Sequence, residues 1–336
     1  MSPAWHLSRR VGPGGRLNSW HDVVETAFLK RTPTNHNMKH VAFLGLGAIG
    51  APMARHLASP DLSLTIWNRT RARVDSFLES NTARSAATPA QAAAEADIVI
   101  TCLPTSRDVA ELLDGPDGIL ATMKPGAVLV DCTSGDPPTS KKIAAKLAER
   151  GIGFLDAPVS GGVAGAVAGK LTVMVGGDEA LLDRVRPVLE KFGARIVHCG
   201  PIGSGDALKA VNNALLAMHI WGTAEGLVAL EKAGVKSEVA LDVINASSGR
   251  SNASMNLFPE RVLNRSFPRT FRLALLDKDV GIAADFVASQ NVPSPLLQLT
   301  SELFKKAHAE LGEEADHVEA VKLVEKSGGA TIGTKS

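Results

Sequence analysis

The sequence predicts an α/β protein: an N-terminal doubly wound parallel sheet, followed by an all-α C-terminal domain. Short apolar runs alternate with helical patterns between residues 39 and 202, and this order is typical of a parallel sheet with helices on both faces. No comparable strand pattern follows residue 204. One long helical pattern, residues 206–233, joins the two parts and is apolar on almost every side, so we expect it to be buried between the domains.

Length and composition limit the possible classes of protein. A chain of 336 residues is long enough for about two domains, and its hydrophobic content of 45% allows large cores. The net charge is +1 and no long basic run occurs, which argues against a nucleic-acid partner. No apolar run has the length that a membrane span needs. The cysteines are few, odd in number and far apart, which suits free thiols in a reducing cytoplasm.

The chain divides into four predicted segments. Residues 1–37 lack hydrophobic periodicity, and we interpret them as an extension outside the fold, poorly ordered apart from a short helix around 21–29. A transit peptide is the alternative, which several arginines favour and two acidic residues oppose. The sheet is expected in residues 38–202 and the helical domain in residues 203–328. Residues 329–336 are expected to form a loose tail.

The elements of the sheet are predicted from apolar runs between turn residues. The first strand begins at His40. Further buried strands are expected at 62–67, 97–103, 127–132 and 154–157, with helices between them at 71–79, 89–96 and 138–150. In such a sheet, ligands bind at the carboxyl ends of the strands, where the strand order reverses. The segments that follow each strand are therefore the candidates for a binding site.

A glycine-rich turn, GLGAIG, follows the first strand. Gly45 permits a tight turn, Gly47 has no side chain to hold a phosphate away, and Gly50 lets the next helix pack close to the strand. A strand precedes the turn, a helix follows it, and a second strand ends about twenty residues later. This context predicts a Rossmann dinucleotide site; a purely structural turn is the alternative. The expected cofactor contacts are Gly45, Leu46, Gly47, Ala48, Ile49 and Gly50.

The residues after the second strand bear on the choice of cofactor. An acidic residue here would bind the ribose 2′-hydroxyl of NAD, but the sequence has Asn68, Arg69 and Thr70. Asn68 carries no charge that would repel a 2′-phosphate, Arg69 can bind it with two hydrogen bonds, and Thr70 adds a hydroxyl. NADP(H) is therefore favoured. NAD(H) stays possible, because Arg69 can also be an ordinary surface arginine.

Two further strand ends are expected at the same rim of the sheet. Leu103 and Pro104 follow the strand at 97–103, and Ser134 follows the strand at 127–132. A proline and short hydroxyl residues in these positions suit contacts to the ribose and the nicotinamide of a dinucleotide. The alternative role of the hydroxyl residues is to cap helices.

Four motifs together resemble the β-hydroxyacid dehydrogenase family, the group of 3-hydroxyisobutyrate dehydrogenases and of tartronate and succinic semialdehyde reductases. In chain order they are GLGAIGAPMARHL from Gly45, DAPVSGG from Asp156, GSG from Gly203 with KAVNN from Lys209, and the Lys278-Asp279 pair. Only Ile49 departs from the first motif, where the family usually has methionine. The resemblance extends from residue 38 to about residue 311. It implies an NAD(P)-dependent oxidoreductase acting on CH–OH groups.

The DAPVSGG motif also has a physical interpretation. A strand ends at Pro158, and Ser160, Gly161 and Gly162 then form a turn that exposes backbone N–H groups. Such donors and a serine hydroxyl can bind a carboxylate, although a plain connecting turn is the alternative. The resemblance implies that Ser160 and Gly161 bind the carboxylate of a small hydroxy acid or aldehyde acid, and we include Gly162 in this predicted substrate site.

The long helix contains the predicted catalytic pair. Lys209 and Asn213 are four residues apart and therefore lie on one helix face. Burial lowers the pKa of a lysine, which suits it to general acid/base catalysis near neutral pH. We expect Lys209 to take the hydroxyl proton as hydride leaves the carbon, and Asn213 to orient the substrate oxygen or the Lys209 ammonium. A lysine that extends to solvent and a capping asparagine are the alternative.

A second cation, Lys278, is implied by the resemblance to lie beside the nicotinamide and the substrate. Its charge would help to lower the pKa of Lys209. The alternative is a surface lysine paired with Asp279 or Asp285. Two other functions compete with a dehydrogenase: an imine reductase and a non-catalytic cofactor-binding module. Related proteins of both kinds generally lack the lysine at the position of Lys209, so its presence argues against them.

The remaining helices are expected at 236–246, 255–263, 273–289, 295–310 and 318–325. The stretch 247–259 is loop-like and is expected near the substrate. Gly222 and Gly226, four residues apart, would allow close helix packing. The apolar surplus of this half and the resemblance both suggest a homodimer or homotetramer. No plausible metal cluster is found in the sequence.

Overall fold

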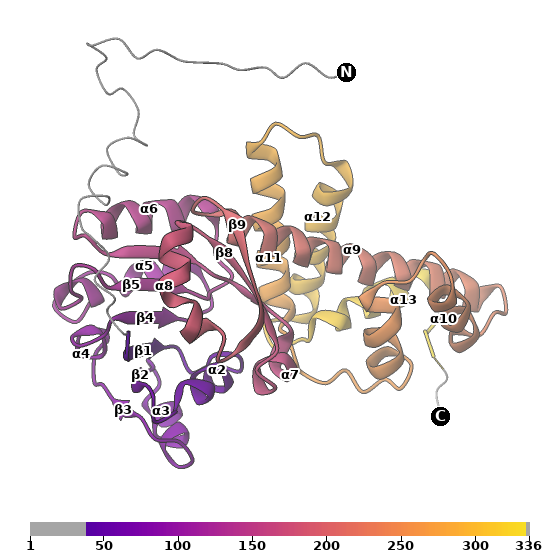
Figure 1. Ribbon diagram of the computed structural model, residues 1–336. Helices are drawn as coiled ribbons and strands as arrows, with labels where there is room; N and C mark the ends of the chain where they lie inside the picture. Colours follow the sequence, from indigo (N-terminus) through magenta and orange to yellow (C-terminus); the bar gives the residue numbers. More distant parts are fainter. Residues whose placement is uncertain (1–37, 334–336) are drawn as a thin grey trace, which may run out of the picture. The chain divides into compact units, whose positions relative to one another are not determined.

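The computed structural model describes residues 38–333 (Figure 1). The predictions made for residues 1–37, including a helix around 21–29, lie outside the described residues. Within the described part the chain begins with strand β1, His40–Leu44, and helix α2, Gly50–Leu57, with the glycine-rich turn between them.

The first half of the described chain forms a nine-stranded sheet with the order β3-β2-β1-β4-β5-β6-β8-β7, and β9 lies beside β8. All neighbours from β3 to β6 are parallel, whereas β8 is antiparallel to both β6 and β7. The predicted doubly wound parallel sheet is confirmed, with an antiparallel addition at one edge. The strands after β1 are β2 Ser63–Trp67, β3 Arg84–Ser85, β4 Ile98–Thr101, β5 Val128–Asp131, β6 Gly153–Asp156, β7 Val159–Ser160, β8 Leu171–Gly176 and β9 Gly193–Gly200.

Helices cover both faces of this sheet. Alternate residues of β1 belong to different buried clusters: Val41 and Phe43 pack with Met53 of α2, whereas Leu44 packs with Ile143 of α6. This alternation shows that the strand is buried on both sides. The helices after α2 are α3 Arg71–Leu78, α4 Pro89–Ala93, α5 Ser106–Glu111, α6 Pro137–Ala148, α7 Gly162–Val167 and α8 Glu179–Leu189, with a short 3₁₀ turn η1 at Ile119–Ala121.

Several short elements were absent from the prediction. Strands β3 and β7 have two residues each, too few for any alternation to be recognised. Strand β9 has only one fully buried residue, so it lacks the continuous apolar run of a central strand. Helix α8 was predictable, because its apolar residues are regularly spaced and Asp178 caps its first turn through a bond from Leu181 N at 2.8 Å.

The second half is entirely helical, as predicted. Its first helix, α9, Ser204–Lys232, contacts β8 and β9 of the sheet as well as α11, α12 and α13 (Figure 1). The others are α10 Ser237–Ala246, π-helix η2 Ala253–Val262, α11 Leu273–Ser289, α12 Pro295–Leu311, 3₁₀ helix η3 His317–Ala320 and α13 Val321–Gly328. Among residues 38–333, no helix has both the length and the apolar content that a membrane crossing needs.

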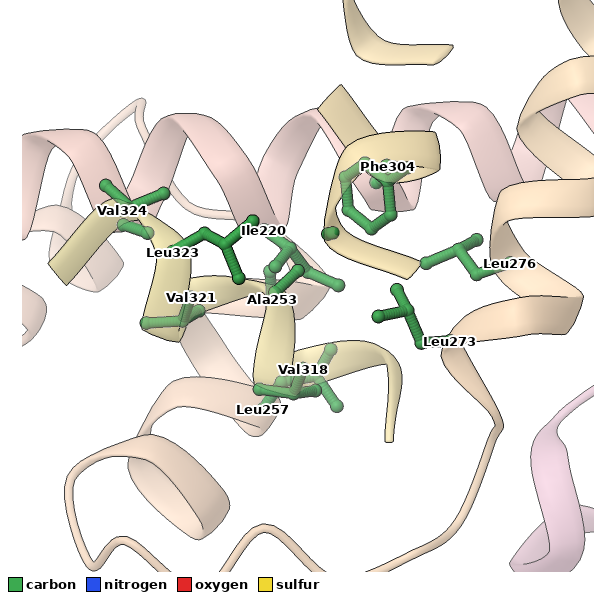
Figure 2. Packing of buried hydrophobic residues seen from close by; sticks show 14 of the residues in the cluster. Ile220, Ala253, Leu257, Leu273, Leu276, Phe304, Val318, Val321, Leu323 and Val324 are labelled. Carbon is green, nitrogen blue, oxygen red and sulfur yellow. The ribbon is translucent and has the colours of Figure 1, made fainter. Parts of the chain in front are cut away.

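A single apolar cluster holds these helices together. Figure 2 shows side chains from α9, η2, α11, α12, η3 and α13 converging on one another. Its members include Ile220 of α9, Leu276 of α11, Phe304 of α12 and Val318 of η3, all fully buried. Complete burial of such side chains, each worth about 1.5–3 kcal/mol, makes this cluster the main stabilising feature of the helical half.

Two predictions about this half are wrong. The stretch 247–259 is not a loop throughout, because η2 begins at Ala253 and buries Leu257 and Phe258. The helix expected at 255–263 is present, and it begins two residues earlier than expected. The tail is not loose over residues 329–333 either: Ile332 is fully buried and its N–H donates to Glu325 Oε1 at 2.9 Å. Residues 334–336 lie outside the described chain.

We predict that Gly205, at the start of α9, tolerates no side chain. A Cβ here would lie 2.3 Å from the carbonyl oxygen of Met174 and 2.9 Å from that of Asp156. Both oxygens belong to the sheet, so Gly205→Ala must displace the helix and should lower the free energy of unfolding by about 1–3 kcal/mol. Unfolding in urea, followed by circular dichroism, measures this change.

The matched control is Gly281→Ala in the middle of α11, where an added Cβ would meet nothing within 4 Å. Because alanine favours a helix over glycine, this variant should gain roughly 0.5–1 kcal/mol. Equal losses in the two variants would contradict the close approach of Gly205 to the sheet.

A second prediction concerns the buried carboxyl group of Asp131 at the end of β5. Its Oδ1 accepts bonds from Thr101 Oγ1 at 2.8 Å and Thr133 N at 3.0 Å, but burial raises its pKa from 3.8 to about 6. The folded state therefore holds this proton more tightly than the unfolded state does, and the contribution of Asp131 to stability falls as the pH rises from about 4 to about 6.

Asp131→Asn removes this titration. The free energy of unfolding of the variant minus that of the natural protein should therefore be higher at pH 7 than at pH 4 by roughly 1–3 kcal/mol. Urea midpoints at the two pH values measure the difference. The control is Asp75→Asn, whose carboxylate is exposed and pairs with Arg71. An identical pH dependence in Asp131→Asn and the natural protein would refute the assignment.

Candidate active site

The glycine-rich turn packs closely against the residues around it. A Cβ at Gly50 would lie 2.0 Å from the carbonyl oxygen of Gly45, so the start of α2 can reach this position only with glycine. Gly45 N donates to Trp67 O at 3.0 Å, which ties the turn to the end of β2. Within residues 38–333, the N–H groups of Ala48 and Ile49 donate to no protein acceptor. A turn with free N–H groups at a helix start fits a pyrophosphate.

The three residues after β2 have different roles. Asn68 is engaged within the protein: its Oδ1 accepts from Leu46 N at 2.9 Å, and its Nδ2 donates to Thr70 O at 3.0 Å. It therefore fixes the shape of the turn. The side chain of Arg69 is 82% exposed, and its only ion-pair partner in residues 38–333 is Asp108 at 3.8 Å. Thr70 stands before α3 without making a side-chain cap.

The sequence analysis missed a second arginine at this place. Nη1 of Arg73 lies 4.0 Å from the position of a Cβ on Gly47, so its guanidinium reaches the glycine-rich turn. Arg73 has no ion-pair partner within residues 38–333, whereas its neighbour Arg71 pairs with Asp75 at 2.8 Å. Arg73 lies in the first turn of α3, and the sequence spacing gives no signal that it reaches Gly47.

The rim formed by β4 and β5 is cross-linked by hydroxyl groups. Leu103 N donates to Thr133 Oγ1 at 3.0 Å, and Thr133 N donates to the carboxyl of Asp131. Pro104 is exposed just beyond β4. The carbonyl oxygen of Ser134 accepts a hydrogen bond from Lys278 Nζ, which brings α11 of the helical half onto this rim.

The second and third motifs meet at the start of α9. Asp156 Oδ1 accepts from Gly203 N at 2.7 Å, which joins the second motif to the third. Met174 N donates to Pro158 O at 3.0 Å, and the carbonyl oxygen of Met174 lies against Gly205, so the same strand contacts both motifs. Ser160 pairs with Thr172 two positions away on β8. The predicted substrate turn and the catalytic helix are thus held by one strand.

Asp279 connects the predicted catalytic residues. Its Oδ2 accepts from Asn213 Nδ2 at 2.6 Å, and its Oδ1 lies 2.9 Å from Lys278 Nζ. Asn213 Oδ1 in turn accepts from Asn212 Nδ2 at 3.1 Å. The sequence analysis treated Asp279 only as an alternative partner of Lys278. The structure contains that ion pair, but Lys278 also binds Ser134, so the pair lies at the rim and not on an outer surface.

Lys209 is 8% exposed, and its side-chain amine makes no hydrogen bond or ion pair within residues 38–333. Burial lowers its pKa; the negative charge of Asp279 opposes this effect, and the positive charge of Lys278 adds to it. A buried amine with a lowered pKa and free lone-pair capacity can accept and return a proton.

The turn after β7 has an unusual backbone. Gly161 and Gly162 have φ values of +135° and +63°, and Gly162 is the first residue of α7. Ser160 is half-buried on β7. Together with Lys278 of the helical half, this turn offers groups that can bind an anion, while Lys209 offers one that can move a proton.

Comparison with known families agrees with this arrangement. Residues 40–200 match the NAD binding domain of 6-phosphogluconate dehydrogenase. Residues 203–324 match the family described as NAD-binding of NADP-dependent 3-hydroxyisobutyrate dehydrogenase. These matches cover both halves of the described chain and establish that its cofactor is a nicotinamide adenine dinucleotide, NAD(H) or NADP(H).

Individual relatives match this chain over nearly their whole lengths. The chain is 37% identical over 293 residues to 2-(hydroxymethyl)glutarate dehydrogenase of Eubacterium barkeri, covering 87% of this chain and 97% of that one. It is 36% identical over 274 residues to NAD-dependent L-serine dehydrogenase of Pseudomonas aeruginosa, covering 80% and 92%. The solved 3-hydroxyisobutyrate dehydrogenase of Mycobacterium tuberculosis with L-serine has a TM-score of 0.78, 33% identity and coverage of 85% and 99%. The chain therefore belongs to the β-hydroxyacid dehydrogenase family.

Proposed function

We propose that this protein catalyses reversible hydride transfer between a nicotinamide cofactor, with NADP(H) preferred, and a small alcohol or aldehyde that bears a carboxylate. The observation that carries the proposal is the buried Lys209 amine, which lacks a hydrogen-bond partner among the described residues and lies within the electrostatic reach of Lys278 and Asp279. The class of substrate is that of 3-hydroxyisobutyrate.

In this proposal, one proton passes between the substrate oxygen and the Lys209 amine. When bound, the nicotinamide accepts or supplies the hydride. In oxidation, neutral Lys209 takes the proton of the substrate hydroxyl as the hydride leaves the same carbon, and the amine becomes an ammonium. In reduction, the ammonium returns the proton to the forming alkoxide. The lowered pKa of Lys209 supports both directions, because the neutral amine is then more accessible than that of an ordinary exposed lysine.

The remaining groups hold the substrate in place. Ser160, Gly161 and Gly162 supply a hydroxyl and backbone donors for the carboxylate, and Lys278 adds a positive charge from α11. Asn213 orients the reacting oxygen or the Lys209 amine; its own position is fixed by Asp279 at 2.6 Å. Because both ends of the Asn213 amide are hydrogen-bonded, this side chain loses little conformational freedom when the substrate binds. This favours a well-oriented transition state.

The preference for NADP(H) rests on the two arginines near the glycine-rich turn. Neither Arg69 nor Arg73 is neutralised at close range by an acidic residue of the described chain, and Thr70 leaves its hydroxyl available. A 2′-phosphate next to Arg69 would gain charge-assisted hydrogen bonds. The NAD dependence of the L-serine dehydrogenase relative makes this preference a question for measurement.

The two competing functions have less support. An imine reductase or a non-catalytic cofactor-binding module needs no buried lysine at this position, whereas a hydroxy-acid dehydrogenase uses one. Turnover separates them: 3-hydroxyisobutyrate, L-serine, 2-(hydroxymethyl)glutarate and a cyclic imine are each assayed with both cofactors through nicotinamide absorbance. Oxidation of at least one hydroxy acid supports the proposal, and turnover of the imine alone contradicts it.

We also propose a homodimer or homotetramer. Leu208 and Leu215 of α9 are 46% and 48% exposed, and an added Cβ at Gly222 or Gly226 would meet nothing within 4 Å. These four residues form one exposed stripe of the helix. Contact with a second copy would cover this stripe.

Lys209→Ala should lower kcat by about 10²- to 10⁴-fold, because it removes the only group proposed to move the proton. NADP(H) should still bind within about twofold, as measured by nicotinamide fluorescence, since general acid/base loss acts on turnover and not on cofactor affinity. The control is Lys305→Ala, an exposed lysine of α12. Near-normal turnover by Lys209→Ala would rule out this role.

Arg69→Ala should raise KM for NADPH by roughly 10-fold or more, because hydrogen bonds to a charged phosphate are stronger than neutral ones, while KM for NADH changes little. Arg73→Ala should act in the same direction. Arg71→Ala serves as the control, because Arg71 pairs with Asp75 at 2.8 Å. If Arg69→Ala changed both KM values equally, the 2′-phosphate contact would be excluded.

A further inference from the structure

Helices α2 and α7 link the proposed cofactor and substrate sites. Helix α2 begins at the glycine-rich turn, and α7 begins at the turn formed by Ser160 to Gly162. The helices pack directly: Ala166 of α7 is fully buried in the same cluster as Met53 and Leu57 of α2. Their far ends therefore meet, while their first residues lie at the two binding sites.

His56, in the last turn of α2, forms the polar part of this contact. Its Nε2 lies 2.9 Å from the carbonyl oxygen of Ala166 and 3.2 Å from that of Val167. Both partners can only accept, so Nε2 carries the hydrogen. Within residues 38–333, these are the only side-chain hydrogen bonds between α2 and α7.

The residues around the His56 imidazole leave space for the ring and offer it hydrogen-bond acceptors. Gly169 has φ +66°, and a Cβ there would lie 3.2 Å from His56 Cε1, so glycine leaves room for the ring. Ala166 O also accepts from Gly169 N at 3.3 Å, but Val167 O has no second partner among the described residues. The final carbonyls of a helix need such outside donors.

Helix α7 depends on this donor more than most helices would. It has six residues, GVAGAV, and none of them has a polar side chain. A helix this short has little stability of its own, so its position is set by its contacts. Since Gly161 caps α7 and Gly162 is its first residue, a shift of the helix also moves these two residues of the proposed substrate turn.

We infer that His56 is a positioning residue, which fixes the carboxylate-binding turn relative to the cofactor helix. The inference rests on the proposed function, because it takes Ser160 to Gly162 as the substrate turn. It adds a residue that touches neither cofactor nor substrate but determines how well the two are aligned. Loss of the donor should weaken substrate binding, while α2 still holds the pyrophosphate turn at its other end.

The test compares His56→Leu, which lacks a donor, with His56→Gln, whose amide N–H can reach the same carbonyls. Arg55→Leu, an exposed neighbour in the same helical turn, is the control. Each variant is assayed with the hydroxy acid that the natural protein turns over best. KM for that acid, kcat, the NADPH dissociation constant by fluorescence and the thermal midpoint are measured.

His56→Leu should raise KM for the hydroxy acid by about tenfold, with kcat and NADPH affinity within about twofold, and His56→Gln should recover most of the loss. Three results would overturn the inference: an unchanged KM in His56→Leu, an equal weakening of NADPH binding, or no recovery with glutamine. If the natural protein oxidises no hydroxy acid, the proposed function fails first; failure of the inference alone needs an active natural protein.

Discussion

The arrangement of the site depends on the buried carboxylate of Asp156, which holds the start of α9 against the sheet. It accepts from Gly203 N at 2.7 Å and from Asp206 N at 3.1 Å, two groups that the helix itself cannot satisfy. Asp206 then accepts from Gly135 N at 3.1 Å and Ser140 Oγ at 2.6 Å. The position of Lys209, one turn further along, follows from this anchor. The ends of β5 and β6 and the first turn of α9 are thus one rigid unit.

This anchor has an electrostatic cost. Burial raises the pKa of Asp156 and of Asp206, and each carboxyl group lies near another. Backbone N–H groups and a hydroxyl compensate, and within residues 38–333 no lysine or arginine bonds to these two carboxyl groups. Neutral donors alone therefore fix the start of the helix.

The sequence predicted most of the architecture, because the parallel sheet and the long helix have strong periodic signals. It also indicated Lys209, Asn213 and Lys278 as candidate site residues, since the family motifs contain them, and their roles stay predictions. It did not predict the parts that depend on tertiary contact. The link from Asp279 to Asn213 joins residues 66 positions apart, and the link from His56 to Ala166 joins residues 110 apart. Arg73 reaches Gly47 only because α3 packs beside the turn, which spacing alone does not reveal.

A lowered pKa both reduces the energetic cost of burying Lys209 and suits its amine to proton transfer. A buried ammonium without a partner is costly, and the cost falls if the amine is neutral. Asp279 is near enough to oppose this by its charge, but its two oxygens are engaged by Asn213 and Lys278. Were Asp279 hydrogen-bonded to Lys209 instead, the amine would stay protonated and lose its use as a base. The bonds to Asn213 and Lys278 therefore act on the proton affinity of a residue that they do not touch.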